Sequence, residues 1–132
     1  MKLITRDTDY ALRSLCFIAK SKGRIVPVTE LTRELRVRRP FLRKILQVLN
    51  RKGILRSIKG KGGGFVLAKG LSGIFLTDIM RIFQGDFRLN ECLLNKLTCP
   101  RKNTCVLRKK VVKIEDYVIR ELSSISIASL LR

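Results

Sequence analysis

Histidine and tryptophan are absent from this sequence, and only 10 of its 132 residues are acidic. Histidine is the side chain that most often moves protons near neutral pH, so its absence removes the commonest general acid or base. The sequence also lacks a Gly-x-Ser-x-Gly nucleophile motif and a phosphate-binding loop ending in Gly-Lys-Ser or Gly-Lys-Thr. These absences argue against an enzyme.

Aromatic residues make up only 6% of the chain, and no apolar run approaches the length of a membrane span. Scarce aromatics disfavour a protein that stacks single-stranded bases, so a basic RNA-associated protein is the weaker alternative. The N-terminus shows no apolar segment with a signal-cleavage pattern. We therefore expect a cytoplasmic protein with no membrane partner and no small-molecule substrate. Its four cysteines are then expected to be thiols or metal ligands.

Positive charge is what the chain has in excess. Lysine and arginine total 29, which gives a formal net charge of +19. Residues 1–70 hold 18 of these bases and 4 acids, whereas residues 71–132 hold 11 bases and 6 acids. Lys and Arg that neutralise phosphates supply most non-specific affinity for nucleic acid. The asymmetry therefore predicts a nucleic-acid contact in the first half, with an anionic membrane surface as the competing partner.

The bases concentrate between Arg36 and Lys61, a stretch without a single acid. Within it, Leu42, Ile45, Leu46 and Leu49 recur at the spacing of one helix face, and Gly53 is expected to end that helix. Two apolar segments, 54–58 and 65–68, flank the Gly-rich run 59–64 and predict a β-hairpin. A basic helix followed by a basic-tipped hairpin is typical of a winged-helix DNA-binding protein.

Helices are also expected before and after this unit. An apolar face from Ala11 to Ala19 predicts a first helix capped at Asp7-Thr8. Thr29 is expected to cap a short second helix that buries Leu31 and Leu35, and Pro40 suits the first turn of the third. Leu76 to Phe83 predicts a fourth helix, and Ser126 is expected to cap a short last one. The predicted fold is mainly α with a small β-hairpin wing: a winged helix-turn-helix over 1–70, and over 71–132 a fourth helix, a cysteine-containing loop and a long helix.

The long helix begins at Val106, where Leu107, Val111, Ile114 and Val118 repeat at intervals of four, three and four residues. About 18 helical residues would span roughly 27 Å, more apolar surface than a small domain can cover. We therefore expect a second copy of this helix to cover it in a homodimer, with an intramolecular core helix as the alternative.

The residues above resemble the IscR/NsrR type of winged-helix transcription regulator, the Rrf-type family. The resemblance rests on segments 8–15, 42–47, 52–57 and 59–68, the last reading Lys-Gly-Lys-Gly-Gly-Gly-Phe-Val-Leu-Ala. It implies a dimer joined through the long C-terminal helix. It also implies that three cysteines between the fourth and fifth helices hold an iron–sulfur cluster in some members.

Three cysteines, Cys92, Cys99 and Cys105, lie within 14 residues. Thiolates suit iron–sulfur clusters, but spacing alone leaves open free thiols, or one disulfide with a spare cysteine. With no histidine for a fourth ligand, the resemblance to NsrR-like members implies Asp9 of the partner subunit, in Thr8-Asp9-Tyr10-Ala11-Leu12. The alternative for Asp9 is an acid favoured by the helix dipole, and Glu91 and Asp86 are fallback ligands. The expected cofactor is a [2Fe-2S] or [4Fe-4S] cluster that senses redox, nitric oxide or iron–sulfur status. A regulator of the same fold that senses through thiols, zinc or a small ligand is the alternative.

The expected partner is double-stranded DNA. The third helix is expected to enter the major groove, where Arg39 and Arg43 are the candidates for reading bases. Pro40 and Phe41 are candidates for thymine methyl contacts, with a core role equally open for Phe41. The complete set of expected DNA-binding residues is Arg36, Arg38, Arg39, Pro40, Phe41, Arg43, Lys44, Arg51, Lys52, Lys59 and Lys61. Of these, Arg36, Lys44, Arg51 and Lys52 are assigned to phosphates, and Lys59 and Lys61 to the minor groove.

Overall fold

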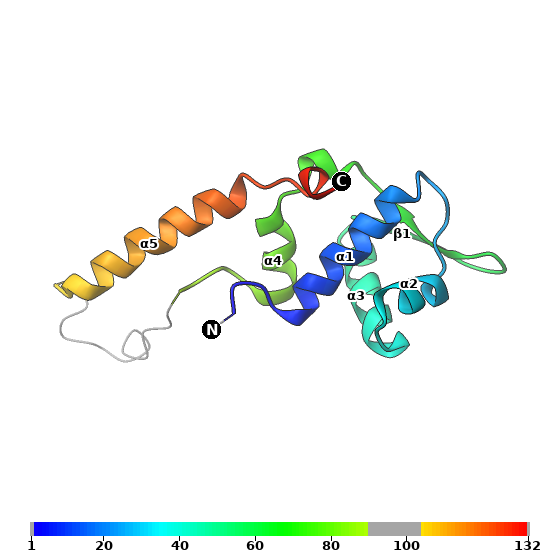
Figure 1. Cartoon of the computed structure of the whole chain (residues 1–132), viewed down its shortest axis with the longest axis horizontal. Helices are drawn as coiled ribbons and strands as arrows, with labels where there is room; N and C mark the ends of the chain where they lie inside the picture. Colours follow the sequence, from blue (N-terminus) through cyan, green and yellow to red (C-terminus); the bar gives the residue numbers. More distant parts are fainter. Residues whose placement is uncertain (1, 90–103, 132) are drawn as a thin grey trace.

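The computed structural model describes residues 2–89 and 104–131. Figure 1 shows a body of short helices with a hairpin on one side and a long helix projecting from the other. The elements in order are α1 (Arg6–Lys20), α2 (Val28–Leu35), α3 (Arg39–Arg51), β1 (Leu55–Ile58), β2 (Gly64–Leu67), the 3-10 turn η1 (Leu71–Gly73), α4 (Leu76–Gln84), α5 (Val106–Ser123) and the 3-10 turn η3 (Ala128–Leu130). This arrangement confirms the predicted mainly α fold with a β-hairpin wing.

Helix α1 lies at the centre of the core and contacts α2, α3, α4 and β2. Its residues Ala11, Leu15 and Ile18 are buried, as their spacing predicted. The predicted cap at Asp7-Thr8 was wrong, because the helix begins one residue after Thr5, whose hydroxyl accepts a hydrogen bond from the backbone N–H of Thr8. Thr8 is instead a fully buried polar residue inside the helix.

Helices α2 and α3 form the predicted helix-turn-helix. Leu31 is fully buried and Leu35 is half-buried, and the whole apolar face of α3 is in the core. The predicted cap at Thr29 was wrong, since α2 begins at Val28 after Pro27. The turn between the two helices is tight because Arg36 adopts a left-handed conformation, with φ at 52°. Pro40 lies in the first turn of α3, as predicted.

The wing is an antiparallel pair in which Leu55 faces Leu67 and Ile58 faces Gly64. Both strands lie within one residue of their predicted positions. Val26, in the link between α1 and α2, adds a bridge to Phe65, with N–O distances of 2.9 and 3.0 Å. That bridge requires glycine at 64, because a Cβ there would lie 2.3 Å from the carbonyl oxygen of Val26.

Helix α4 packs on α1, and α5 packs on α4. Two hydrogen bonds of 2.8 Å join the start of α4 to the segment after α5: Leu76 N–H donates to Ile125 and Ile127 N–H donates to Ile74. Only the C-terminal end of α5 reaches the core, through the buried Leu122. The rest of α5 extends away from α1–α3 (Figure 1). No described helix is long and apolar enough to cross a membrane. A short 3-10 helix, η3, forms where a last short helix was predicted; the residue before it is Ile127, and the Ser126 hydroxyl accepts a hydrogen bond of 3.2 Å from the Ser129 backbone N–H.

Candidate DNA-binding surface and cysteine site

A groove of about 710 Å³ runs between α3 and the wing. Arg39, Arg43 and Gln47 line it from α3 at successive four-residue intervals, so their side chains leave the same face of the helix. Ser57, Lys59 and the wing glycines close the opposite side. The groove thus combines guanidinium groups, an amide and exposed backbone, which are the donors that nucleic-acid-binding proteins direct at phosphates and base edges.

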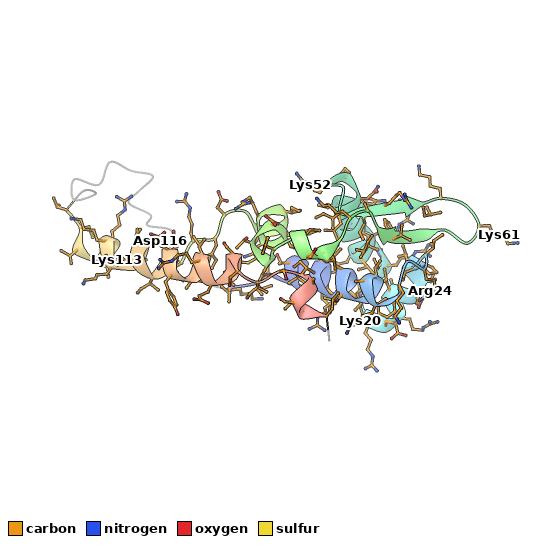
Figure 2. The ribbon with its side chains drawn as sticks, turned by 90° about the horizontal axis from the view of Figure 1, so that it is seen from above. Lys20, Arg24, Lys52, Lys61, Lys113 and Asp116 are labelled. Carbon is orange, nitrogen blue, oxygen red and sulfur yellow. The ribbon has the colours of Figure 1, made fainter. Side chains whose placement is uncertain are left out.

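The bases predicted to bind DNA surround this groove. Arg39, Arg43, Arg51 and Lys59 line it directly. Arg36 and Arg38 occupy the turn between α2 and α3, and Lys44 and Lys52 are exposed beside α3. Lys61 lies at the tip of the hairpin, and Lys52 lies at the edge of the body (Figure 2). Four of the predicted bases therefore meet at the groove, and the others lie on the turn before α3, on α3 or at its end, and at the tip of the wing.

Few acids compete for these cations. Across residues 2–89 and 104–131, none of the recorded ion pairs involves a base between Arg36 and Lys61. The two nearest acids before this stretch pair with other bases: Glu34 lies 4.0 Å from Arg33, and Glu30 is held by Arg24 through two hydrogen bonds of 2.7 and 2.8 Å. The basic surface is therefore available to an external polyanion.

Sequence reasoning missed two polar residues of α3. Gln47 lines the groove one turn after Arg43, and Asn50 accepts a hydrogen bond of 3.3 Å from the Ser57 backbone N–H. The second contact ties the end of α3 to the wing. The spacing of Gln47 could have identified it, since it follows Arg43 by four residues and Arg39 by eight. A search for charged side chains alone does not find it, because its amide is neutral.

Pro40 and Phe41 occupy different surroundings at the start of α3. Pro40 is exposed, whereas Phe41 is half-buried and its ring meets that of Tyr10 edge-on with centroids 5.6 Å apart. The Arg6 guanidinium lies over the Phe41 ring at 4.5 Å. Phe41 therefore joins α1 to the first turn of α3.

Two of the four expected cluster ligands lie in the described part of the chain. Cys105 is half-buried at the start of α5 and lines a cavity of about 420 Å³ with Phe87, Arg88 and Val111. Asp9 is on the exposed side of α1 and accepts a hydrogen bond of 3.0 Å from Arg13. Cys92 and Cys99 lie outside the described residues, as does the fallback ligand Glu91.

Of the two described groups, the Cys105 thiol at the cavity is a donor of the kind that iron–sulfur centres use, whereas the Asp9 carboxylate is an oxygen donor of the kind that harder metal ions prefer. Among the described residues, no three His, Cys, Asp or Glu side chains converge on one point. A complete ligand set would therefore need Cys92, Cys99 or a second protomer. Cys16 stands apart on α1, where burial raises the pKa of its thiol.

The Rrf2 family model, described as an iron-dependent transcriptional regulator, matches residues 4–132. The chain belongs to the Rrf2 family. A helix-turn-helix transcriptional regulator of Aquifex aeolicus (strain VF5) is 33% identical over 119 residues, which are 88% of this chain and 83% of that protein. The relatives of this Rrf2 chain are thus regulators, and Rrf2 regulators bind DNA and are commonly dimeric.

Two solved structures share the fold of the Rrf2 chain. CymR of B. subtilis, described as its global cysteine regulator, aligns with a TM-score of 0.77 at 24% identity, covering 98% of this chain and 96% of that chain. T. potens IscR aligns with a TM-score of 0.74 at 20% identity, covering 98% and 85% of the respective chains.

Helix α5 of the Rrf2 chain divides the predicted apolar seam between two faces. Val111 and Val118 are half-buried: Val118 packs against the core, and Val111 lines the cavity beside Cys105. Leu107, Ile114 and Tyr117 are 70%, 55% and 58% exposed. Exposed apolar side chains at this spacing form a stripe that nothing in the described part of the protomer covers.

Proposed function

We propose that this chain is a homodimeric, DNA-binding transcriptional regulator that reads duplex DNA through α3 and the wing. The groove lined by Arg39, Arg43 and Lys59 carries this proposal. Arg43 reads a base in the major groove, where its guanidinium can donate to O6 and N7 of guanine. Lys44, Arg51 and Lys52 bind phosphates beside the groove, and the wing tip enters the minor groove.

Selection of duplexes from a random pool tests this function and supplies the binding site. Arg43→Ala should weaken the selected duplex by about 10- to 100-fold, from the loss of one bidentate contact, and should weaken random DNA far less. Lys113→Ala is the charge-matched control, because Lys113 lies at the opposite end of the molecule from Lys61 (Figure 2). Equal losses on both duplexes would show that Arg43 is only a phosphate contact.

The proposed input is an iron–sulfur cluster held by Cys92, Cys99 and Cys105, with Asp9 of the partner subunit as the fourth ligand. The family description as iron-dependent and the thiol of Cys105 at a cavity support it. A bound cluster would supply a centre sensitive to oxidation and nitric oxide. Asp9 must first exchange its Arg13 partner for this role, because their side chains are hydrogen-bonded in the protomer. Ordering of the cysteine-containing segment against the partner's α1 would set the spacing of the two copies of α3.

Anaerobic purification followed by iron and sulfide analysis tests the cluster. We expect iron, sulfide and visible absorption in the wild type, and loss of all three in Cys105→Ala. Asp9→Ala should alter the spectrum, whereas Asp7→Ala, on the same first turn, should not. Protein without iron would overturn the cluster and leave DNA binding intact.

A same-fold regulator without a cluster is the second candidate. The apolar cavity beside Cys105, with Arg88 and Glu115 at its wall, is large enough for a small ligand and favours it. Zinc or thiol oxidation would also use Cys105. Metal analysis of Cys92→Ala against wild type, with thiol titration before and after peroxide, separates these inputs.

A further inference from the structure

Gln84, the last residue of α4, is bonded to the start of α1 through its side chain. Its Oε1 accepts hydrogen bonds from the Thr8 hydroxyl at 2.7 Å and from the Thr5 backbone N–H at 3.0 Å. Its Nε2 donates to the Leu3 carbonyl at 3.1 Å. Thr8 is fully buried and Gln84 half-buried, so breaking their bond would cost the buried Thr8 hydroxyl its Gln84 partner. The end of α4 and the first turn of α1 therefore move together.

The same two turns of α1 contact the start of α3 on their other side. Arg6 lies over the ring of Phe41 at 4.5 Å, and Tyr10 packs edge-on against that ring. Phe41 follows Arg39 and precedes Arg43, the two candidates for reading bases. A change in the position of α1 can therefore reach the base-reading end of α3 through the Phe41 ring, which contacts both Arg6 and Tyr10.

We propose that Gln84 and Phe41 are positioning residues that join the end of α4 to the recognition helix through the first two turns of α1. This rests on the proposed function, because it assumes that α3 reads DNA. The cysteine-containing segment follows directly after α4, so this link would carry its state to α3. Phe41 then affects DNA binding by positioning α3 from beneath the DNA-binding surface, and it does not itself contact DNA.

The link is built from parts that transmit displacement. Residues 5–10 lie at the start of one continuous helix whose backbone hydrogen bonds keep it rigid. The side chain at each end of the link makes more than one contact: Gln84 makes three hydrogen bonds, and the Phe41 ring contacts both Arg6 and Tyr10. Coupling through such chains of packed groups typically changes binding by roughly 2- to 30-fold.

A double-mutant cycle on the selected duplex tests the link. Gln84→Met removes all three hydrogen bonds at similar volume, and Phe41→Leu removes the ring that Arg6 and Tyr10 contact. Each should weaken the selected duplex by roughly 2- to 30-fold and random DNA by less than 2-fold. The double variant should bind the selected duplex as well as the more impaired of the two single variants, because both changes break the same link. Losses that multiply would overturn the proposal and favour a direct contact between Phe41 and DNA.

Gln84→Glu is the conservative variant. A carboxylate can still accept hydrogen bonds from Thr5 and Thr8 but cannot donate to Leu3. Gln84→Glu should therefore bind the selected duplex with most of the wild-type affinity, unlike Gln84→Met. If Gln84→Met does not fold, the cycle is run with Thr8→Val, which removes the buried hydrogen bond to Gln84, and Phe41→Leu, and the same test of additivity applies.

Hydrogen exchange without DNA gives a second readout. In Gln84→Met, the Leu42 amide, which donates to Arg38 at 3.1 Å in the first turn of α3, should exchange faster, while the Val48 and Leu49 amides keep their protection. Unchanged exchange at Leu42 would overturn the link. A wild-type protein that selects no duplex would instead overturn the proposed function, so the two failures are distinct.

Discussion

At the scale of single residues, the wing depends on the lack of a side chain at one position. A Cβ on Gly64 would lie 2.3 Å from the Val26 carbonyl oxygen and 2.6 Å from its carbon, both backbone atoms that cannot rotate away. Gly64→Ala should therefore separate Val26 from Phe65 and lower the free energy of unfolding by about 1–3 kcal/mol. Denaturant unfolding measures this.

Gly70→Ala is the matched control for Gly64. Gly70 has an ordinary φ of −67° and open space where a Cβ would stand. This substitution should leave stability unchanged or raise it by up to about 1 kcal/mol, since alanine has less conformational freedom to lose on folding. Equal effects of the two substitutions would contradict the close approach of β2 to Val26.

Glu30 gives a prediction in acid. Its hydrogen bonds from the Arg24 guanidinium hold the pKa of the Glu30 carboxyl below its ordinary value. A carboxyl with a depressed folded pKa adds stability above its unfolded pKa and loses it as pH falls through the folded pKa. Glu30→Gln should therefore flatten the fall in unfolding free energy as the pH drops from the ordinary glutamate pKa through the lower folded pKa of Glu30, by a small amount because the pair is exposed.

Glu34→Gln serves as the control for Glu30, because the ion pair of Glu34 with Arg33 spans 4.0 Å between exposed side chains. Its pH profile should match that of the wild type. A profile for Glu30→Gln that also matches would mean that the Arg24 pair contributes nothing in solution.

At the scale of elements, α5 gives the clearest test of assembly. The exposed apolar stripe is formed by Leu107, Ile114 and Tyr117. A symmetric dimer would bury both copies of each residue, one from each protomer. Ile114→Lys would place two unpaired charges in that interface and should weaken dimerisation by roughly 100-fold or more. Sedimentation equilibrium measures the monomer–dimer balance.

Asp116→Lys also introduces lysine at an exposed position of α5, and a step of two residues from Ile114 turns the side chain about 200° around the helix axis, away from the stripe. It should leave the dimer intact. Dissociation by both variants alike would indicate that charge, and not the stripe, governs assembly. A wild-type monomer at high concentration would remove the dimer from the proposal.

The elements themselves were largely predictable, because their signals are local. The period of Leu42, Ile45, Leu46 and Leu49 defines α3, and the alternation around the Gly-rich run defines the wing to within one residue. The predicted caps of α1 and α2 were wrong, because the Thr5 hydroxyl caps α1 and because Pro27, which has no hydroxyl, precedes α2. Thr8 was taken for a cap, yet it is buried against Gln84.

Contacts between distant segments left no such signal. Gln84 and Thr8 are 76 positions apart, and nothing in either neighbourhood predicts their hydrogen bond. The division of the α5 seam into a half-buried face and an exposed face also depends on where α4 packs, which the heptad-like spacing does not contain. The DNA-binding residues stay a prediction. Charge identifies the candidates, and binding experiments are needed to measure how much each contributes to affinity.

At the scale of the whole molecule, a net charge of +19 makes the salt dependence of DNA binding informative. Each neutralised phosphate contributes about 0.9 to the slope of log K against log salt. The residues assigned to phosphates are Arg36, Lys44, Arg51 and Lys52. Their full use by both protomers would give a slope of about −7, and use by a single protomer about −4.

One substitution then counts the protomers on the DNA. Lys52→Ala removes one phosphate contact per protomer, so the slope should fall in magnitude by about 1.8 for a bound dimer and by about 0.9 for a monomer. Lys113→Ala changes the net charge equally, yet it lies at the far end of the protein from Lys61 and should leave the slope as it was (Figure 2). A slope that responds equally to both would mean that the whole charge of the protein, rather than its α3 and wing flank, attracts DNA. A change near 0.9 would mean that a single protomer contacts the duplex. DNA binding would then not depend on dimerisation through α5.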